Sequence, residues 1–185
     1  MNKALFLDRD GVINVDHAYV HKVEDFEFIE GVFTACQAFV AAGYKIIVVT
    51  NQSGIGRGYY DEQQFHALSD WMCQQFSAHG IDISGVYFCP HHPEKAVAPY
   101  KVDCDCRKPE PGMLLQAIAE HNIDPAHSVM VGDKLSDIAA ARAAAINTTV
   151  LVKSGQSVNA KEHDLADFVC DSIQQVPNCI LTSAG

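Results

Sequence analysis

The stretch FLDRDGVIN, residues 6–14, decides the fold, because its apolar run ends in two acids that lie one residue apart. An apolar run of this kind predicts a buried strand. Carboxylates resist burial unless they are paired or bind a metal ion. Asp8 and Asp10 therefore mark the end of this strand as a candidate site, although DRDG alone is equally typical of a turn.

Outward from this stretch, strand-like and helix-like segments alternate. The pattern predicts strands in KALFLD, KIIVVTN, GVYFCP, SVMVGD and TTVLVKSG, with DFVCDS as a weak sixth strand. It predicts helices over about 31–42, in DEQQFHALSDWMCQQFSAHG with Asp61 as N-cap, in PEPGMLLQAIAEHN, in LSDIAAARAAAI and near the C-terminus. This alternation favours a three-layer α/β fold, a doubly wound parallel sheet with helices on both faces. We expect residues 1–185 to form a single domain.

Composition narrows the classes of function. The chain has 185 residues, 48% of them hydrophobic and 19% charged, and its formal net charge is -10. This charge argues against a nucleic-acid partner. The sequence has no apolar run of membrane-spanning length and no signal-peptide core, so we expect a cytoplasmic protein, and we favour a monomer. Any phosphate site in such an acidic protein must concentrate its cations locally.

Polar residues follow three of the predicted strands, in FLD, VVTN and MVGD. Sites in parallel α/β sheets form beyond the carboxyl ends of the strands, so Asp8, Thr50, Asn51 and Asp133 are expected to converge. Carboxylates gathered there repel one another and suit Mg²⁺. The Gly-rich segment 50–58 could form a turn whose backbone N–H groups face an anion. The alternative is that this segment is only a flexible loop.

Together these motifs resemble the haloacid dehalogenase superfamily of phosphatases. DxDG after the first strand, Thr50, Lys108 before a helix and GDKLSD after a later strand occur in the order of that family, over residues 5–152. The resemblance implies Mg²⁺-dependent hydrolysis through an aspartyl-phosphate, with Asp8 as nucleophile and Asp10 as general acid and then base. Taken alone, Lys108 could equally be a solvated surface residue.

The resemblance also implies roles for the residues around these two acids. Thr50 and Lys108 would stabilise the transferring phosphoryl group, and Mg²⁺ would be held by Asp8, the backbone carbonyl of Asp10, and Asp133. Asp137 would orient either Lys108 or a metal-bound water. The alternative is that Asp137 is an exposed acid in the first turn of a helix, where the helix dipole favours a negative charge. Because alternate side chains of extended backbone face the same way, Asp8 and Asp10 can address one phosphoryl group while Arg9 points elsewhere.

Three of the seven cysteines cluster in CPHHPEKAVAPYKVDCDCRK, between the third strand and Lys108. Cys89, His91, Cys104 and Cys106 form a set of ligands for a tetrahedral, structural Zn²⁺, with His92 as the competing imidazole. Such an ion would hold this long loop in one conformation. It would also fix the direction of Arg107 and Lys108, which follow the last ligand. The remaining cysteines, Cys36, Cys73, Cys170 and Cys179, are isolated along the sequence. Cys36 and Cys73 lie in helix-like stretches and are expected to be buried free thiols.

The chain leaves no room for a separate cap domain, since only 20 residues lie between Asp10 and Gly31. The short chain and its motifs resemble one group of capless members of the superfamily, and this resemblance implies an open site and a phosphorylated sugar as substrate. We expect removal of the 7-phosphate from a D-glycero-D-manno-heptose 1,7-bisphosphate, in the synthesis of precursors for lipopolysaccharide or surface glycans. Histidinol phosphate is the alternative substrate, and a non-catalytic phosphate-binding module is the alternative class. The expected substrate contacts are Asp16, His17, Ala18, Tyr19, Asn51, Gln52, Ser53, Arg107 and Lys134.

Overall fold

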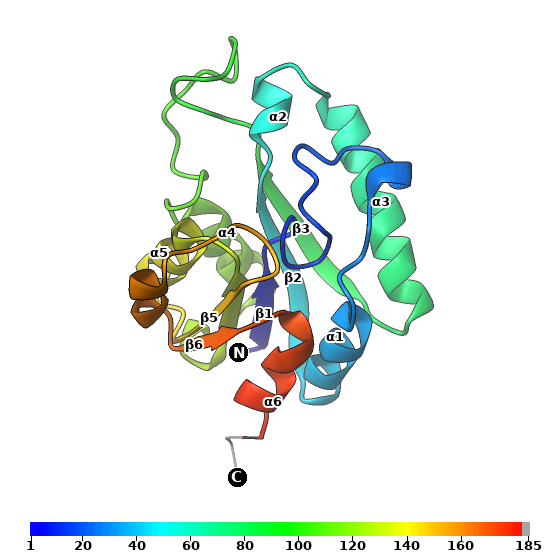
Figure 1. Ribbon diagram of the computed structural model, residues 1–185, viewed down its shortest axis with the longest axis vertical. Helices are drawn as coiled ribbons and strands as arrows, with labels where there is room; N and C mark the ends of the chain where they lie inside the picture. The colour runs from blue at the N-terminus through cyan, green and yellow to red at the C-terminus, as the bar shows by residue number, and fades with distance from the viewer. Residues whose placement is uncertain (183–185) are drawn as a thin grey trace.

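A six-stranded parallel sheet forms the centre of the computed structural model, which describes residues 1–182 (Figure 1). All six predicted strands are confirmed, and they lie in the order β3-β2-β1-β4-β5-β6. The order reverses at β1, which pairs with β2 on one side and β4 on the other, and such a switch point is where open α/β sheets bind ligands. The strands are β1 (Lys3–Leu7), β2 (Tyr44–Asn51), β3 (Ile83–Cys89), β4 (Val129–Gly132), β5 (Thr148–Val152) and β6 (Phe168–Cys170).

Helices cover both faces of the sheet, as predicted (Figure 1). One face carries α1 (Val32–Ala41), α3 (Glu62–Ala78) and α6 (Val176–Ile180), and the other carries α4 (Gly112–His121) and α5 (Leu135–Ala143). The Gly-rich segment, expected to be a loop, contains the short helix α2 (Ser53–Gly56). Short 3-10 turns occupy Val23–Asp25, Pro125–His127, Ala160–Leu165 and Ile173–Gln175.

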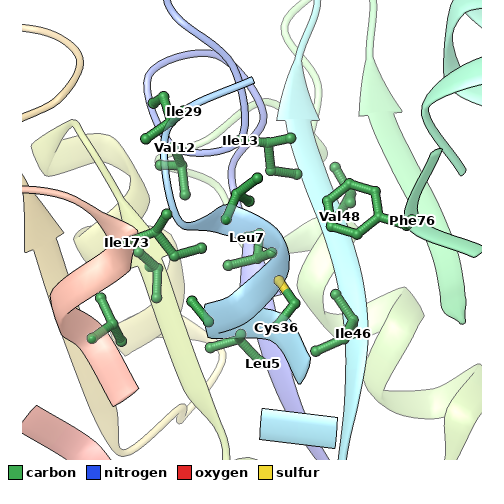
Figure 2. Packing of buried hydrophobic residues seen from close by; sticks show 14 of the residues in the cluster. Leu5, Leu7, Val12, Ile13, Ile29, Cys36, Ile46, Val48, Phe76 and Ile173 are labelled. Atoms are coloured by element: carbon green, nitrogen blue, oxygen red, sulfur yellow. The ribbon is translucent and has the colours of Figure 1, made fainter. Parts of the chain in front are cut away.

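The apolar residues of β1 pack into two hydrophobic cores, one on each face of the sheet. Successive side chains of a strand point to opposite faces. Leu5 and Leu7 pack in the cluster beneath α1, α3 and α6, together with Ile46 and Val48 of β2 (Figure 2). Ala4 and Phe6 pack in the cluster beneath α4 and α5. The continuous apolar run before Asp8 is thus explained by burial on both sides of the sheet.

Loops, and no second sheet, surround the carboxyl edge of the strands within residues 1–182. The segment between Asp10 and Gly31 contains only the turn Val23–Asp25, and residues 90–111 contain no helix or strand. The latter loop lies beside α2 in Figure 1, where the Val97 backbone N–H donates to the Gly56 carbonyl at 2.8 Å. No helix of the described chain is both long enough and apolar enough to cross a membrane.

Two of the cysteines that are isolated along the sequence are neighbours in the structure. The Sγ atoms of Cys170 in β6 and Cys179 in α6 lie 3.3 Å apart. Both residues belong to the core on the α1 face, because α6 returns the chain to that side of the sheet after β6. The fold thus brings together two cysteines that stand apart in the sequence.

Helix α3 begins with the capping interaction that the sequence predicts. The side chain of Asp61 accepts a hydrogen bond from the Gln64 backbone N–H at 2.8 Å, and the Gln64 side chain bonds the Asp61 backbone N–H in return. We expect Asp61→Ala to lower the free energy of unfolding by about 1 kcal/mol, since this substitution removes the cap. Urea denaturation measures the change. Asp70→Ala, at an exposed position in the middle of the same helix, is the matched control, and an equal loss in both variants would contradict the assignment.

Candidate active site

The carboxyl ends of β1 and β4 bring the first acids together. Asp8 directly follows β1, and its backbone N–H donates to the carbonyl of Val131 in β4 at 3.1 Å, which places it near Asp133. The turn after Asp8 passes close to Asp133, and Gly11 allows this approach. Its φ is +87°, and a Cβ atom there would lie 2.4 Å from Asp133 Oδ2. The glycine of the DxDG motif is thus required by both conformation and space.

The ammonium group of Lys108 lies among acceptors at the floor of the site. Its Nζ is 3.0 Å from Asp8 Oδ1, 2.6 Å from Asp137 Oδ1 and 2.8 Å from the carbonyl oxygen of Val49. Burial by itself would lower the pKa of Lys108, but Asp137 and Asp8 raise it overall, so the ammonium stays charged. Both alternatives that place Lys108 and Asp137 at the surface are wrong, since the residues are only 3% and 1% exposed.

Three carboxylates beside this ammonium could hold a metal ion. Oxygens of Asp8, Asp133 and Asp137 all lie within 4.8 Å of one another. Asp133 Oδ2 accepts from the Gln156 backbone N–H at 2.8 Å, whereas Asp133 Oδ1 is buried without a partner within residues 1–182. Burial and the charge of Asp137 raise the pKa of Asp8 well above its ordinary value, and they raise that of Asp133 too. An orphaned carboxylate oxygen and a set of hard oxygen donors fit Mg²⁺.

Asp10 has a different environment from Asp8. Its Oδ1 accepts from Arg9 Nη2 at 2.9 Å and from Asn14 Nδ2 at 3.0 Å, and its Oδ2 accepts from Gln52 Nε2 at 3.0 Å. Burial would raise the pKa of Asp10, but the charge of Arg9 and these hydrogen bonds lower it overall. Arg9 itself lines neither the cavity nor the hollow at Asp8, in keeping with the expectation that it points elsewhere than to the phosphoryl group.

The last two residues of β2, Thr50 and Asn51, hydrogen-bond the residues that form the site. The side chain of Asn51 pairs with the Lys108 backbone in both directions, at 3.0 Å and 3.1 Å, and so fixes the start of the lysine side chain. Thr50 is fully buried, and its Oγ1 accepts from Gln52 Nε2 at 2.8 Å. Thr50 therefore reaches the site through Gln52, and its proposed contact with a phosphoryl oxygen stays a prediction.

A cavity of about 590 Å³ opens above these groups. Nearly all of the expected substrate contacts line it: Asp16, Ala18, Tyr19, Asn51, Gln52, Ser53, Arg107 and Lys134, together with Asp10 and Lys108. His17 does not, because its ring pairs with Glu27 at 3.0 Å over a neighbouring hollow. A small hollow adjoins this cavity and shares several of its lining residues. Asp8 and Asp137 line the small hollow.

The cavity is also lined by residues that the sequence interpretation did not assign. They are Gly54, Arg57, Tyr60, Pro109, Ser136 and Gln156. Gln156 follows β5 and Ser136 lies in the GDKLSD motif, so the strand-end rule applied to β5 and a fuller reading of that motif could have found both. Tyr60 lies in no recognisable pattern, and only the fold brings it to the site.

The predicted cysteine and histidine ligands converge on one point. The Sγ atoms of Cys89, Cys104 and Cys106 lie 2.8–3.5 Å apart, and His91 Nδ1 lies 3.4 Å from the Cys106 sulfur. The competing imidazole, His92, is used elsewhere: its Nδ1 accepts the backbone N–H groups that follow it. Three thiols and one imidazole within 4.8 Å fit a tetrahedral zinc ion.

Comparison with known proteins agrees with this geometry. The HAD-hydrolase-like family model matches residues 105–176. A D-glycero-beta-D-manno-heptose-1,7-bisphosphate 7-phosphatase from Vibrio cholerae is 52% identical, covering 96% of both chains, and one from Pasteurella multocida is 51% identical, covering 97% of both. The chain therefore belongs to the haloacid dehalogenase superfamily of phosphatases, in one family with these relatives.

A solved structure extends the likeness to three dimensions. The D,D-heptose 1,7-bisphosphate phosphatase from B. bronchiseptica, complexed with magnesium and phosphate, superimposes with a TM-score of 0.81 at 29% identity. The alignment covers 98% of this chain and 99% of that one. That relative thus carries, on the same fold, a magnesium ion and a phosphate ion.

We expect Asp8→Asn to stabilise the protein in Mg²⁺-free buffer at neutral pH, because it removes a buried charge beside two others. A carboxyl whose pKa is raised by folding stabilises the fold at acid pH and loses that contribution as the pH rises through its folded pKa. The stability difference between variant and wild type should therefore grow as the pH rises from 4 to neutrality. Urea denaturation over this range measures it.

The control for this experiment is Asp82→Asn, at an exposed site. This variant should stay within about 0.5 kcal/mol of wild type throughout. Added Mg²⁺ should then stabilise wild type more than Asp8→Asn, because the variant lacks one ligand. A wild type that is more stable than Asp8→Asn in Mg²⁺-free buffer at neutral pH would refute the electrostatic interpretation.

Proposed function

We propose that the protein is a Mg²⁺-dependent phosphatase that removes the 7-phosphate of D-glycero-β-D-manno-heptose 1,7-bisphosphate through an aspartyl-phosphate intermediate. The observation that carries the proposal is the group formed by Lys108, Asp8 and the two further acids, at the floor of a cavity with other cations in its wall. A function in the synthesis of heptose precursors for lipopolysaccharide or surface glycans follows from this reaction.

Asp8 is the nucleophile in this mechanism. Its Oδ1 accepts hydrogen bonds from Lys108 Nζ at 3.0 Å and from the Arg9 backbone N–H at 2.9 Å, so we assign the attack on phosphorus to Oδ2. Asp8 and Asp133, with the backbone carbonyl of Asp10, would hold Mg²⁺, which when bound neutralises charge on the phosphoryl group. The ammonium of Lys108 adds positive charge where the phosphoryl oxygens gather.

Asp10 is the general acid and base. As the bond between phosphorus and the sugar oxygen breaks, Asp10 gives its proton to that oxygen; it then takes a proton from the water that hydrolyses the intermediate. Asp10 lines both the cavity and the small hollow, whereas Asp8 lines the small hollow alone. We therefore assign the leaving group to the cavity and the phosphorus atom to the small hollow.

The cavity wall favours a bisphosphate over histidinol phosphate. Arg57, Arg107 and Lys134 line it in addition to Lys108, and a second phosphate needs such groups, whereas a cationic substrate would be repelled by them. The names of the curated relatives support the same substrate. A non-catalytic phosphate-binding module would have no use for a partly buried acid such as Asp10 in the cavity wall, beside Asp8.

We also propose a structural Zn²⁺ held by Cys89, His91, Cys104 and Cys106. Cys89 ends β3, and the other three ligands lie in the loop of residues 90–111, which has no helix or strand. The last ligand, Cys106, directly precedes Arg107 and Lys108. A bound ion would fix both cations through the backbone. A cytoplasmic, monomeric enzyme fits the proposal, since a reducing compartment keeps the ligand thiols available for metal.

The activity is tested by phosphate release from both candidate substrates. We expect a higher kcat/KM for the heptose bisphosphate than for histidinol phosphate, because the cavity wall is cationic. Asp8→Asn should lower kcat by at least about 10³-fold, since it removes the nucleophile. Asp82→Asn should keep wild-type activity. Faster turnover of histidinol phosphate would overturn the substrate, and an active Asp8→Asn would overturn the mechanism.

The zinc site is tested by elemental analysis of the purified protein. We expect one zinc ion per chain, lost in Cys104→Ser, because a structural site needs all four ligands. Cys73→Ser is the matched control, since that thiol lies in α3 outside the cluster. The melting temperature should fall in the first variant alone. Equal zinc content in both variants would exclude this ligand set.

A further inference from the structure

The side-chain amide of Gln52 is hydrogen-bonded within the protein through both its nitrogen and its oxygen. The side chain is 3% exposed, and both donors of its NH₂ group are used, by Asp10 Oδ2 at 3.0 Å and by Thr50 Oγ1 at 2.8 Å. Its Oε1 accepts a hydrogen bond from the hydroxyl of Tyr60. These bonds give Gln52 a function inside the protein, and its predicted sugar contact stays a prediction.

The partners of Asp10 leave a single direction open to a ligand. An ionised carboxylate has about four acceptor positions. Arg9 and Asn14 use two of them at Oδ1, and Gln52 uses one at Oδ2. The position that remains is the one from which a proton can pass to a leaving group, and its direction depends on where Gln52 holds Oδ2.

Tyr60 is held rigidly enough to fix Gln52. Its ring is 5% exposed and stacks on His21, with centroids 5.0 Å apart and planes within 4°. On another side it touches Gly54, where a Cβ atom would lie 2.3 Å from the ring. It also packs with Ile55 and Phe65 in a small core cluster.

The hydroxyl of Tyr60 sets the orientation of the Gln52 amide. Burial raises the pKa of Tyr60, so its hydroxyl remains a donor. A donor at Oε1 keeps the amide turned so that its NH₂ group faces Asp10 and Thr50. Turned by half a rotation, the amide would place its oxygen against the Asp10 carboxylate, where two acceptors repel each other.

We propose that Tyr60 is a positioning residue, which acts through Gln52 to aim the carboxyl of Asp10 at the leaving group. The inference rests on the proposed function, in which the bond between Asp8 and phosphorus forms, the bond between phosphorus and the sugar oxygen breaks, and that oxygen takes the proton of Asp10. A sugar alkoxide is a poor leaving group and needs this proton, whereas p-nitrophenolate leaves without it.

The experiment compares kcat/KM for the heptose bisphosphate and for p-nitrophenyl phosphate, since kcat/KM excludes the later hydrolysis of the intermediate. We expect Tyr60→Phe to lower the value for the sugar about five- to tenfold and to change that for the aryl ester less than twofold. The ratio of aryl to sugar kcat/KM should therefore rise about fivefold or more. Because both values come from one preparation, the ratio does not depend on the fraction of folded protein.

Tyr59→Phe is the matched control, since it removes a hydroxyl from the exposed neighbouring tyrosine and should leave the ratio unchanged. A double-mutant cycle tests the path: in a Gln52→Met background, Tyr60→Phe should have no further effect on the sugar reaction. A ratio that is unchanged or lower in Tyr60→Phe, or additive effects in the cycle, would overturn the inference alone. A wild type that hydrolyses neither ester would overturn the proposed function instead.

Discussion

One buried ammonium group, that of Lys108, balances the charge of the carboxyl edge of this sheet. Its Nζ contacts Asp8 and Asp137, and Asp133 belongs to the same group of acids. Removing the lysine side chain would cost about 3–5 kcal/mol, because it would leave buried carboxylates uncompensated. The acids that two strands and a helix deliver can therefore stay together only while the loop before α4 delivers this one lysine.

The position of Lys108 in turn depends on how that loop is held. The side chain of Asn51 fixes the Lys108 backbone from the end of β2, and the cysteine cluster ends two residues earlier, at Cys106. Four of the 13 basic residues in a chain of net charge -10 line the cavity. Cations gathered in one hollow of an acidic surface create a local positive field, which draws in an anionic substrate that the remaining surface repels.

The sequence predicted the parts of this site that follow from strands and short motifs. Asp8, Asn51 and Asp133 meet because the ends of neighbouring parallel strands must meet, and the cysteine ligands were visible as a cluster. The surroundings of Asp10 were not predictable. Its hydrogen bond with Arg9 forms after β1 has ended at Leu7.

Tyr60 was not predictable for a related reason. It reaches Gln52 only because α2 forms where a flexible loop was expected and Gly54 leaves room for the ring. Both misses concern contacts made after a strand has ended, where neither side-chain alternation nor helical periodicity constrains direction.

Asp8 and Asp10 show how two acids of one motif acquire different chemistry. Folding raises the pKa of Asp8, which lies among other carboxylates, and lowers that of Asp10, which lies among donors. A nucleophile must be ionised and a general acid must be protonated. The two pKa shifts therefore suit these functions only when the metal cation and the phosphate group are bound. A cation beside Asp8 favours its ionised form, and a phosphate dianion beside Asp10 favours its protonated form. The protein thus fixes the positions of the two acids, and the charges of its ligands complete their protonation states.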